Sequence, residues 1–275
     1  MAEDKEIRLE RLISLLDDPD EDAALMILSE LLAREDEIDP ELLAEYQESS
    51  NKYMRRRIHQ LQSALIQRKR RHDFLRRLND GEVDFFELLL DVHLQWFDND
   101  SPPAVRERLN AFLTCARKNK LSSLEEIAFF MLGSGISAEK DSTLTPELYC
   151  IGSILQECQG AASLLAAIMF HLTETTAQIT VGKVLDEFCL KDTADRILLP
   201  GRNWQIFPAA SLPEFTPWDS RMILKLASAN LFSSAVNSDS LRYILTISQT
   251  LSGLRDDSVL QMLPYPYNLP AEDGE

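Results

Sequence analysis

Long apolar runs and a typical export signal are both missing from this sequence. No stretch approaches the roughly 18 consecutive apolar residues of a membrane-spanning helix, so we expect no membrane association. Residues 1–18 lack a basic segment followed by an uninterrupted apolar run, so we expect no secretory signal and a cytoplasmic location.

Cysteine and histidine are scarce, with four of each. The cysteines form no C-x-x-C pair and have no histidine pair beside them, so the spacing predicts no metal site. In a cytoplasmic chain of this size we expect free thiols. Glycine-rich phosphate loops, H-E-x-x-H and G-x-S-x-G are absent as well, and we therefore expect no cofactor.

Positive charge is in deficit, because 28 Lys and Arg residues face 45 Asp and Glu residues, for a net charge of −17. That balance argues against extensive nucleic-acid binding. Residues 55–77 are the exception, since their only acidic residue is Asp73. The candidate anion-binding residues are Arg68, Lys69, Arg70, Arg71, Arg76 and Arg77. With only Tyr53 and Phe74 nearby for base stacking, the alternative is a face that is solvated or paired with acidic residues.

The apolar spacing predicts successive amphipathic helices from residue 7 to residue 132. Asp20 is positioned to cap one of them and Pro40 to open the next. The remaining predicted helices cover residues 51–78, 83–97, 104–118 and 122–132. A polar, glycine-containing loop over 133–145 is the predicted domain boundary.

The pattern changes in the second half of the chain. A strongly apolar helix is predicted over 160–172, followed by a strand over 179–185 and a hairpin over 196–207. Pro213 and Pro217 indicate an irregular linker. Helices over 218–235 and 239–251 would form a C-terminal αα-hairpin, with a short helix from 256 and a flexible acidic tail over 263–275. The predicted fold is therefore α+β and predominantly α-helical, with a helical N-terminal region over 1–132.

Three segments resemble one known family: MRRRI at 54–58, SILQECQG at 153–160 before the apolar helix, and the segment 221–242, which begins RMIL. With the order of elements, they are similar to the SirB family, a bacterial branch of the transglutaminase-like superfamily. The resemblance spans most of the chain. It implies a degenerate transglutaminase-like core over 133–215 and a tetratricopeptide-like helical hairpin over 216–262. Family members carry a P-G-H-F segment after the core helix, but here Pro200-Gly201 is followed by Arg202-Asn203.

Cys158 is the candidate catalytic residue. In active transglutaminase-like enzymes a nucleophilic cysteine opens the core helix, and ECQGAASLL at 157–165 resembles that segment. A helix N-terminus would stabilise the thiolate. Matching Gly160 to the family's glycine instead places Cys158 in the loop before the helix. The simpler interpretation is a half-buried residue at the helix start.

A cysteine nucleophile also needs a general base within hydrogen-bond reach. His171 lies thirteen residues along the same predicted segment, which is about 20 Å in a helix. The other histidines lie on N-terminal helices, and they are His59, His72 and His93.

These observations favour a non-catalytic transglutaminase-like, SirB-related protein that acts through contacts with another protein. The first alternative is a cysteine-dependent hydrolase or acyltransferase built on Cys158. The second is a nucleic-acid-associated protein that uses residues 55–77. The sequence does not indicate an oligomeric state.

Overall fold

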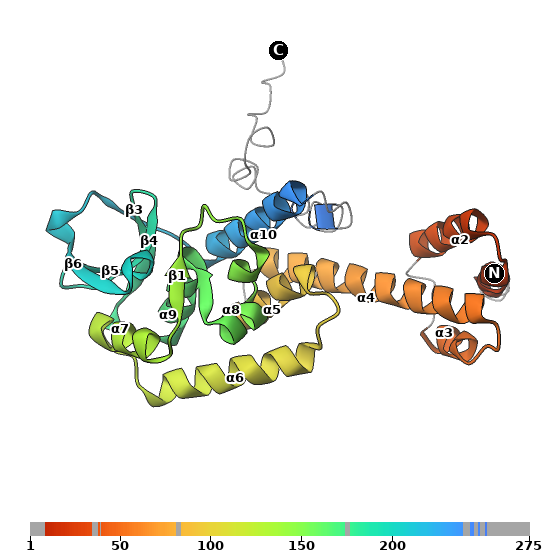
Figure 1. Ribbon diagram of the computed structural model, residues 1–275, viewed down its shortest axis with the longest axis horizontal. Coiled ribbons are helices and arrows are strands. Elements are labelled where there is room, and N and C mark those ends of the chain that lie inside the picture. Colours follow the sequence, from red (N-terminus) through yellow and green to blue (C-terminus); the bar gives the residue numbers. More distant parts are fainter. Residues whose placement is uncertain are drawn as a thin grey trace, which may run out of the picture. The chain divides into compact units, whose positions relative to one another are not determined.

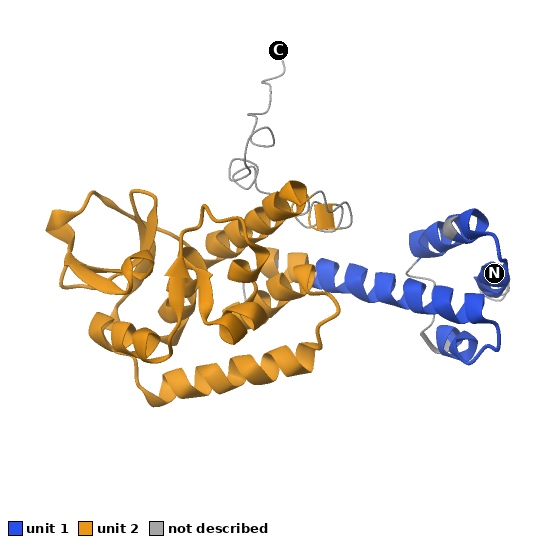
Figure 2. Cartoon of the chain, in the orientation of Figure 1, with its two compact units in different colours: residues 1–73 blue, residues 74–275 orange. Residues whose placement is uncertain are grey.

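The structure, a computed structural model, describes residues 9–34, 38, 40–80, 84–173 and 177–238, together with residues 243, 244, 247 and 251 (Figure 1). The chain divides into two compact units, residues 1–73 and 74–275 (Figure 2). The division falls within the long helix α4 (Lys52–Asp80), and the predicted boundary at 133–145 lies inside the second unit. Helices predominate over two small sheets, which confirms the predicted α+β class.

The described part of the first unit consists of helices and the short connections between them. Residues 9–14 are helical and lead into the 3-10 helix η1 (Leu15–Asp17), and α2 (Glu21–Ala33), α3 (Pro40–Gln47) and the first part of α4 follow. Apolar side chains at helical spacing form one core, made of Leu9, Ile13, Leu16, Leu31, Leu43, Met54, Ile58 and Leu61. The predicted cap is confirmed, because the Asp20 carboxylate accepts from the backbone N–H groups of Asp22 and Ala23.

Arg57 fixes the acidic segment before α2. The residue is 5% exposed, and its guanidinium donates to three backbone carbonyls, those of Leu16 at 3.0 Å, Asp20 at 3.2 Å and Asp18. These bonds satisfy a buried cation and the carbonyls at the end of η1 together. The arginine therefore has a structural role at the entry to α2.

The second unit contains six described helices after α4 and seven strands. The helices are α5 (Phe85–Trp96), α6 (Pro102–Lys118), α7 (Leu124–Gly133), α8 (Ile151–Glu157), α9 (Ala162–Leu172) and α10 (Ser220–Asn237). Strands β1 (Ser137–Glu139) and β2 (Gln159–Ala161) form a parallel pair, with the 3-10 helix η3 (Pro146–Tyr149) between them in the chain. Each predicted helix before residue 238 is found within a few residues of its expected position, α8 being an addition.

The larger sheet is antiparallel, with the strand order β6-β5-β4-β3-β7. Its strands are β3 (Thr180–Val184), β4 (Glu187–Lys191), β5 (Arg196–Leu199), β6 (Gln205–Pro208) and β7 (Phe215–Pro217). Helix α9 packs on one face, mainly against β4. The other face has a separate small core of Val184, Cys189, Ile197 and Leu199. The sheet thus supports α9 from one side.

Two details of this sheet differ from the sequence-based expectation. Strand β4 was not predicted, and the linker expected around Pro213 and Pro217 contains the edge strand β7. Both edge strands, β6 and β7, end in a proline, Pro208 and Pro217, which is where a missing N–H group is tolerated. Gly182 permits the close approach of β7, because a Cβ there would lie 2.4 Å from the Thr216 carbonyl oxygen.

Trp204 joins the sheet to β1. It follows Asn203 in the β5–β6 connection, and both residues adopt positive φ, 54° at Asn203 and 58° at Trp204. A bulky residue is rare in this region, so it must be held by other contacts. The indole is 2% exposed, and its Nε1–H donates to the carbonyl oxygen of Ile136 at 3.0 Å.

Helix α10 is the described part of the predicted αα-hairpin. It packs against α5 and α9, and most of its residues are buried. The predicted helix over 239–251 lies outside the described residues except for four positions, of which Ile247 and Leu251 are buried and Tyr243 stacks on Trp96. The predicted helix from 256 and the tail over 263–275 also lie outside the described residues.

Candidate functional site

Cys158 lies at the C-terminal end of α8, before the core helix α9. It is exposed, it has a φ of 55°, and its carbonyl oxygen accepts from the Ser137 N–H at 3.0 Å. Strand β2 separates it from α9, which begins at Ala162. The negative end of the α8 dipole therefore lies beside Cys158, and the positive end of α9 does not. Among the described residues, no hydrogen bond reaches the Cys158 sulfur.

The residues that open α9 contain no sulfur. Ala162 is the first residue and Ser163 the second. The N-cap residue, Ala161, has no side chain that could satisfy the free amides. Asp141 does this from the loop after β1, because its carboxylate accepts from the Ser163 backbone N–H at 3.1 Å and from the Ser163 hydroxyl. The start of the core helix is therefore closed by an internal carboxylate.

The loop that carries Asp141 is held from two further elements. The Tyr149 hydroxyl donates to the carbonyl oxygens of Asp141 at 2.8 Å and Thr143 at 3.2 Å, and Ser234 on α10 donates to that of Leu144 at 3.0 Å. Burial raises the pKa of Asp141, although the hydrogen bonds from Ser163 act in the opposite direction. The cluster is thus a hydrogen-bonded structural unit at the helix start.

One histidine of the second unit has a carboxylate partner in the described chain, but it faces another part of α8. His93 Nε2 lies 3.1 Å from Asp100 Oδ2, and the ring packs against Gly152 in the first turn of α8. Cys158 is six residues further along, which corresponds to about 9 Å of helix. Desolvation lowers the pKa of His93, whose side chain is 1% exposed. The pair therefore lies too far from Cys158 to be its general base.

The other histidines and thiols do not form a nucleophile–base pair in the described chain. His171 stacks on Phe85 with ring centroids 4.1 Å apart, and His59 and His72 are exposed on α4. Cys150 and Cys189 are fully buried, and burial raises the pKa of both thiols, that of Cys189 to about 12. Cys115 is exposed on α6.

The predicted anion-binding residues all lie on α4, and five of the six take part in intramolecular contacts. The Arg68 guanidinium donates to the Leu32 carbonyl oxygen at 2.6 Å, and Arg77 pairs with Asp91 at 2.6 Å. Arg70, Arg71 and Arg76 also have partners within the chain, whereas no contact is found for Lys69 among the described residues. Two of these arginines, Arg68 and Arg77, therefore pair with a carbonyl group and with an acidic residue of the chain.

Helix α7 presents two large apolar side chains to solvent. Phe129 is 78% exposed and Leu132 is 50% exposed, one turn apart. The opposite face of α7 is buried, and Phe130 there packs on Phe112. Single exposed apolar residues are common, but neighbouring ones on one helix face are typical of a binding surface. Sequence reasoning missed this surface. It could have been recognised from residues 124–132, which contain more apolar side chains than one helix face can bury.

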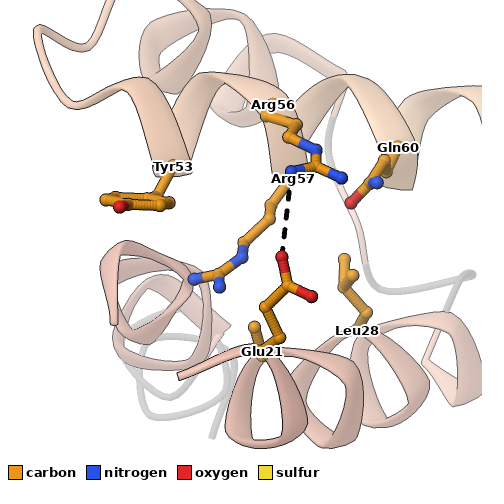
Figure 3. A pocket seen from close by; sticks show the side chains of 7 residues that line it. Glu21, Leu28, Tyr53, Arg56, Arg57 and Gln60 are labelled. Carbon is orange, nitrogen blue, oxygen red and sulfur yellow. Dashed lines mark ion pairs between the residues drawn. The ribbon is translucent and has the colours of Figure 1, made fainter. Parts of the chain in front are cut away.

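A pocket of about 210 Å³ lies between α2 and α4 in the first unit (Figure 3). Its lining residues are Glu21, Ala24, Leu28, Tyr53, Arg56, Arg57 and Gln60. The Glu21 carboxylate reaches from α2 towards Arg56 on α4, at 3.8 Å. Sequence reasoning missed this pocket too. The run of arginines at 55–57 opposite the acidic segment 17–22 was the available signal.

Metal-binding clusters and membrane-spanning helices are both absent from the described part of the chain. Within it, no group of three or more His, Cys, Asp or Glu side chains is arranged to hold a metal ion. None of its helices combines the length and the apolar character that a bilayer crossing requires.

No family model, curated protein or solved structure matches this chain.

Proposed function

We propose that this chain is a non-catalytic protein of the transglutaminase-like, SirB-related kind, which acts by binding another protein through the exposed face of α7. The observation that carries the proposal is the adjacent exposure of Phe129 and Leu132, at 78% and 50%. Aromatic side chains are enriched in interface cores and often supply much of the binding energy.

The family assignment within this proposal is supported by the order of elements. A helix, α9, is followed by an antiparallel sheet on which it packs, and the helical pair predicted in the sequence begins with α10. The resemblance implies this order.

The non-catalytic part is supported by the residues at the start of α9. An active relative would place its nucleophilic cysteine there, and this chain has Ala162 followed by a buried Ser163 that is bonded to Asp141. A hydroxyl that is 0% exposed has no access to a substrate. Cys158 is exposed, but it lies before β2 at the negative end of α8.

Site-specific photocrosslinking tests the binding surface. A photoreactive residue placed at Phe129 should give a discrete adduct in lysate of the source cell, and Phe129→Asp should abolish capture of the same protein by affinity chromatography. Leu185, which is 69% exposed in the β3–β4 turn, is the matched control position. Equal adducts from both positions, or capture that Phe129→Asp leaves unchanged, would contradict the proposal.

A further inference from the structure

The pocket between α2 and α4 holds a loosely joined pair of opposite charges. Arg56 and Glu21 are 3.8 Å apart, and their side chains are 68% and 76% exposed. A charge-assisted hydrogen bond is usually about 2.7–2.9 Å long. The two groups therefore attract each other across a gap without completing a hydrogen bond.

The hydrogen-bonding capacity of the polar walls is largely unused. Within the described chain, neither the Arg56 side chain nor the Gln60 side chain makes a hydrogen bond. Both lie on α4, one turn apart, with the Glu21 carboxylate opposite them on α2 (Figure 3). Arg56 and Gln60 can thus donate hydrogen bonds to an anionic group in the pocket, and the Glu21 carboxylate opposite them can accept hydrogen bonds from a cationic group.

The base and one end of the pocket are fixed. Ala24 is 2% exposed, and Leu28 packs against the core of the first unit. Arg57 is held by its three carbonyl bonds, and its guanidinium carbon lies 5.7 Å from the centre of the Tyr53 ring. Ala24 and Leu28 give the pocket an apolar wall that does not depend on a ligand, and Arg57 and Tyr53 form one end of it.

The volume limits the size of a ligand. At about 210 Å³ the pocket is smaller than the roughly 300–1,000 Å³ of sites that hold drug-sized molecules. It has room for a small molecule with both charges and a short apolar group. A purely anionic ligand would meet the Glu21 carboxylate, and a purely cationic one would meet Arg56.

We infer that this pocket binds a free α-amino acid with an aliphatic side chain, as its zwitterion. The carboxylate accepts hydrogen bonds from Arg56 and Gln60, and the ammonium group pairs with Glu21. The aliphatic side chain lies against Ala24 and Leu28. Because the ligand inserts between Glu21 and Arg56, each of these side chains gains a hydrogen-bonded partner in place of the 3.8 Å contact. This site is separate from the α7 surface of the proposed function.

A titration of the full-length protein with three related probes tests the inference. L-leucine carries both charges, 4-methylpentanoate lacks the ammonium group, and 3-methylbutylamine lacks the carboxylate. Binding is followed by the NMR shifts of backbone amides in α2 and α4. Loss of one charge-assisted interaction should weaken binding about tenfold or more, so leucine should bind saturably and both fragments at least about tenfold more weakly.

Two variants remove one charge each, Glu21→Gln and Arg56→Gln. Their matched controls are Glu30→Gln on α2 and Arg55→Gln on α4, which do not line the pocket. All four positions are on the surface, so each variant should fold, and its circular dichroism spectrum should match the parent spectrum. The pocket variants should lose about tenfold or more in leucine affinity, and the controls should keep the parent affinity.

Three results would overturn the inference. They are the absence of saturable shifts in α2 and α4 with leucine, binding of either fragment as tightly as leucine, and unchanged affinity in both pocket variants. Failure of this site would leave the proposed function of α7 unaffected, because the crosslinking from Phe129 reports on the other unit.

Discussion

Gly152 lies directly against the imidazole of His93, and there is no room for a side chain between them. A Cβ on Gly152 would lie 2.6 Å from Cε1 of the ring and 2.8 Å from Nε2. The ring cannot move freely, because Nε2 is 3.1 Å from Asp100 and the side chain is fully enclosed. The first turn of α8 can therefore pack this closely against α5 because residue 152 has no side chain.

Gly152→Ala should lower the free energy of unfolding by about 1–3 kcal/mol, because the added methyl group overpacks a rigid contact. Urea denaturation measures the change. Gly133→Ala is the matched control, since a Cβ there has no neighbour within 4 Å, and it should change stability by less than about 0.5 kcal/mol. In a His93→Ala background the Gly152→Ala penalty should largely disappear. A penalty that persists there would show that the imidazole is not its cause.

His93 should make the protein less stable in mild acid. Burial lowers its pKa in the folded protein, so the unfolded chain binds the proton more readily. The contribution of the neutral imidazole to the free energy of unfolding is fully present above the pKa of histidine in the unfolded chain, about 6.5. This contribution is lost as the pH falls from about 6.5 through the lower pKa of His93 in the folded protein. Urea denaturation between pH 7.5 and 5 should show a smaller decline for His93→Gln than for the parent. Equal declines would show that the pKa of His93 is not lowered by folding.

Asp141→Ala should destabilise the protein, because the start of α9 loses the only carboxylate that caps it in the described chain. The expected loss is about 1–2 kcal/mol, the usual range for a helix cap. Asp141→Asn should lose less, since its amide oxygen can still accept from the Ser163 N–H. Ser142→Ala, in the same loop, is the control. Thermal denaturation that does not separate Asp141→Ala from this control would contradict the capping role.

Cys158→Gly should stabilise the protein by about 0.5–1 kcal/mol. The residue has a φ of 55°, a conformation in which glycine avoids the steric penalty of a Cβ. Cys158→Ala keeps that penalty and should leave the unfolding midpoint nearly unchanged. If glycine and alanine had the same effect, backbone strain at this position would be negligible.

Alkylation tests Cys158 as a nucleophile. With iodoacetamide at neutral pH, Cys158 should react no faster than Cys115, the other exposed thiol, because no basic side chain contacts the Cys158 sulfur in the described chain. Buried Cys189 should be protected. A Cys158 rate far above that of Cys115 would revive the hydrolase or acyltransferase alternative.

The basic helix should show no salt-sensitive binding to duplex DNA or RNA. Arg68 and Arg77 are engaged within the chain, and the net charge of −17 repels a polyanion. Fluorescence anisotropy at low and high salt measures this directly. Affinity that falls steeply with salt would indicate phosphate contacts and favour the nucleic-acid alternative.

The helices were predictable because their apolar residues recur at helical spacing and their ends carry local signals, such as Asp20 before α2. Strand β4 was missed because its burial depends on α9, a partner that local sequence does not reveal. The strand at Pro217 was missed because a proline usually argues against a strand, although an edge position tolerates it.

The candidate sites were less accessible to sequence reasoning. The choice between two alignments of Cys158 depended on where α9 begins, and Asp141 caps that helix from a loop 22 residues before Ser163. The α2–α4 pocket depends on how two helices pack, and the exposure of Phe129 depends on which face of α7 the core covers. The start of α9, the packing of α2 on α4 and the exposed face of α7 all depend on tertiary contacts, which the spacing of residues in the sequence does not reveal.

The prolines at the ends of β6 and β7 have a consequence for behaviour at high concentration. A sheet with open borders can recruit strands from other copies and grow into fibres. Here each border strand ends in a residue without an amide hydrogen, and each is only three or four residues long. Concentrated solutions should therefore resist fibrillar growth through this sheet.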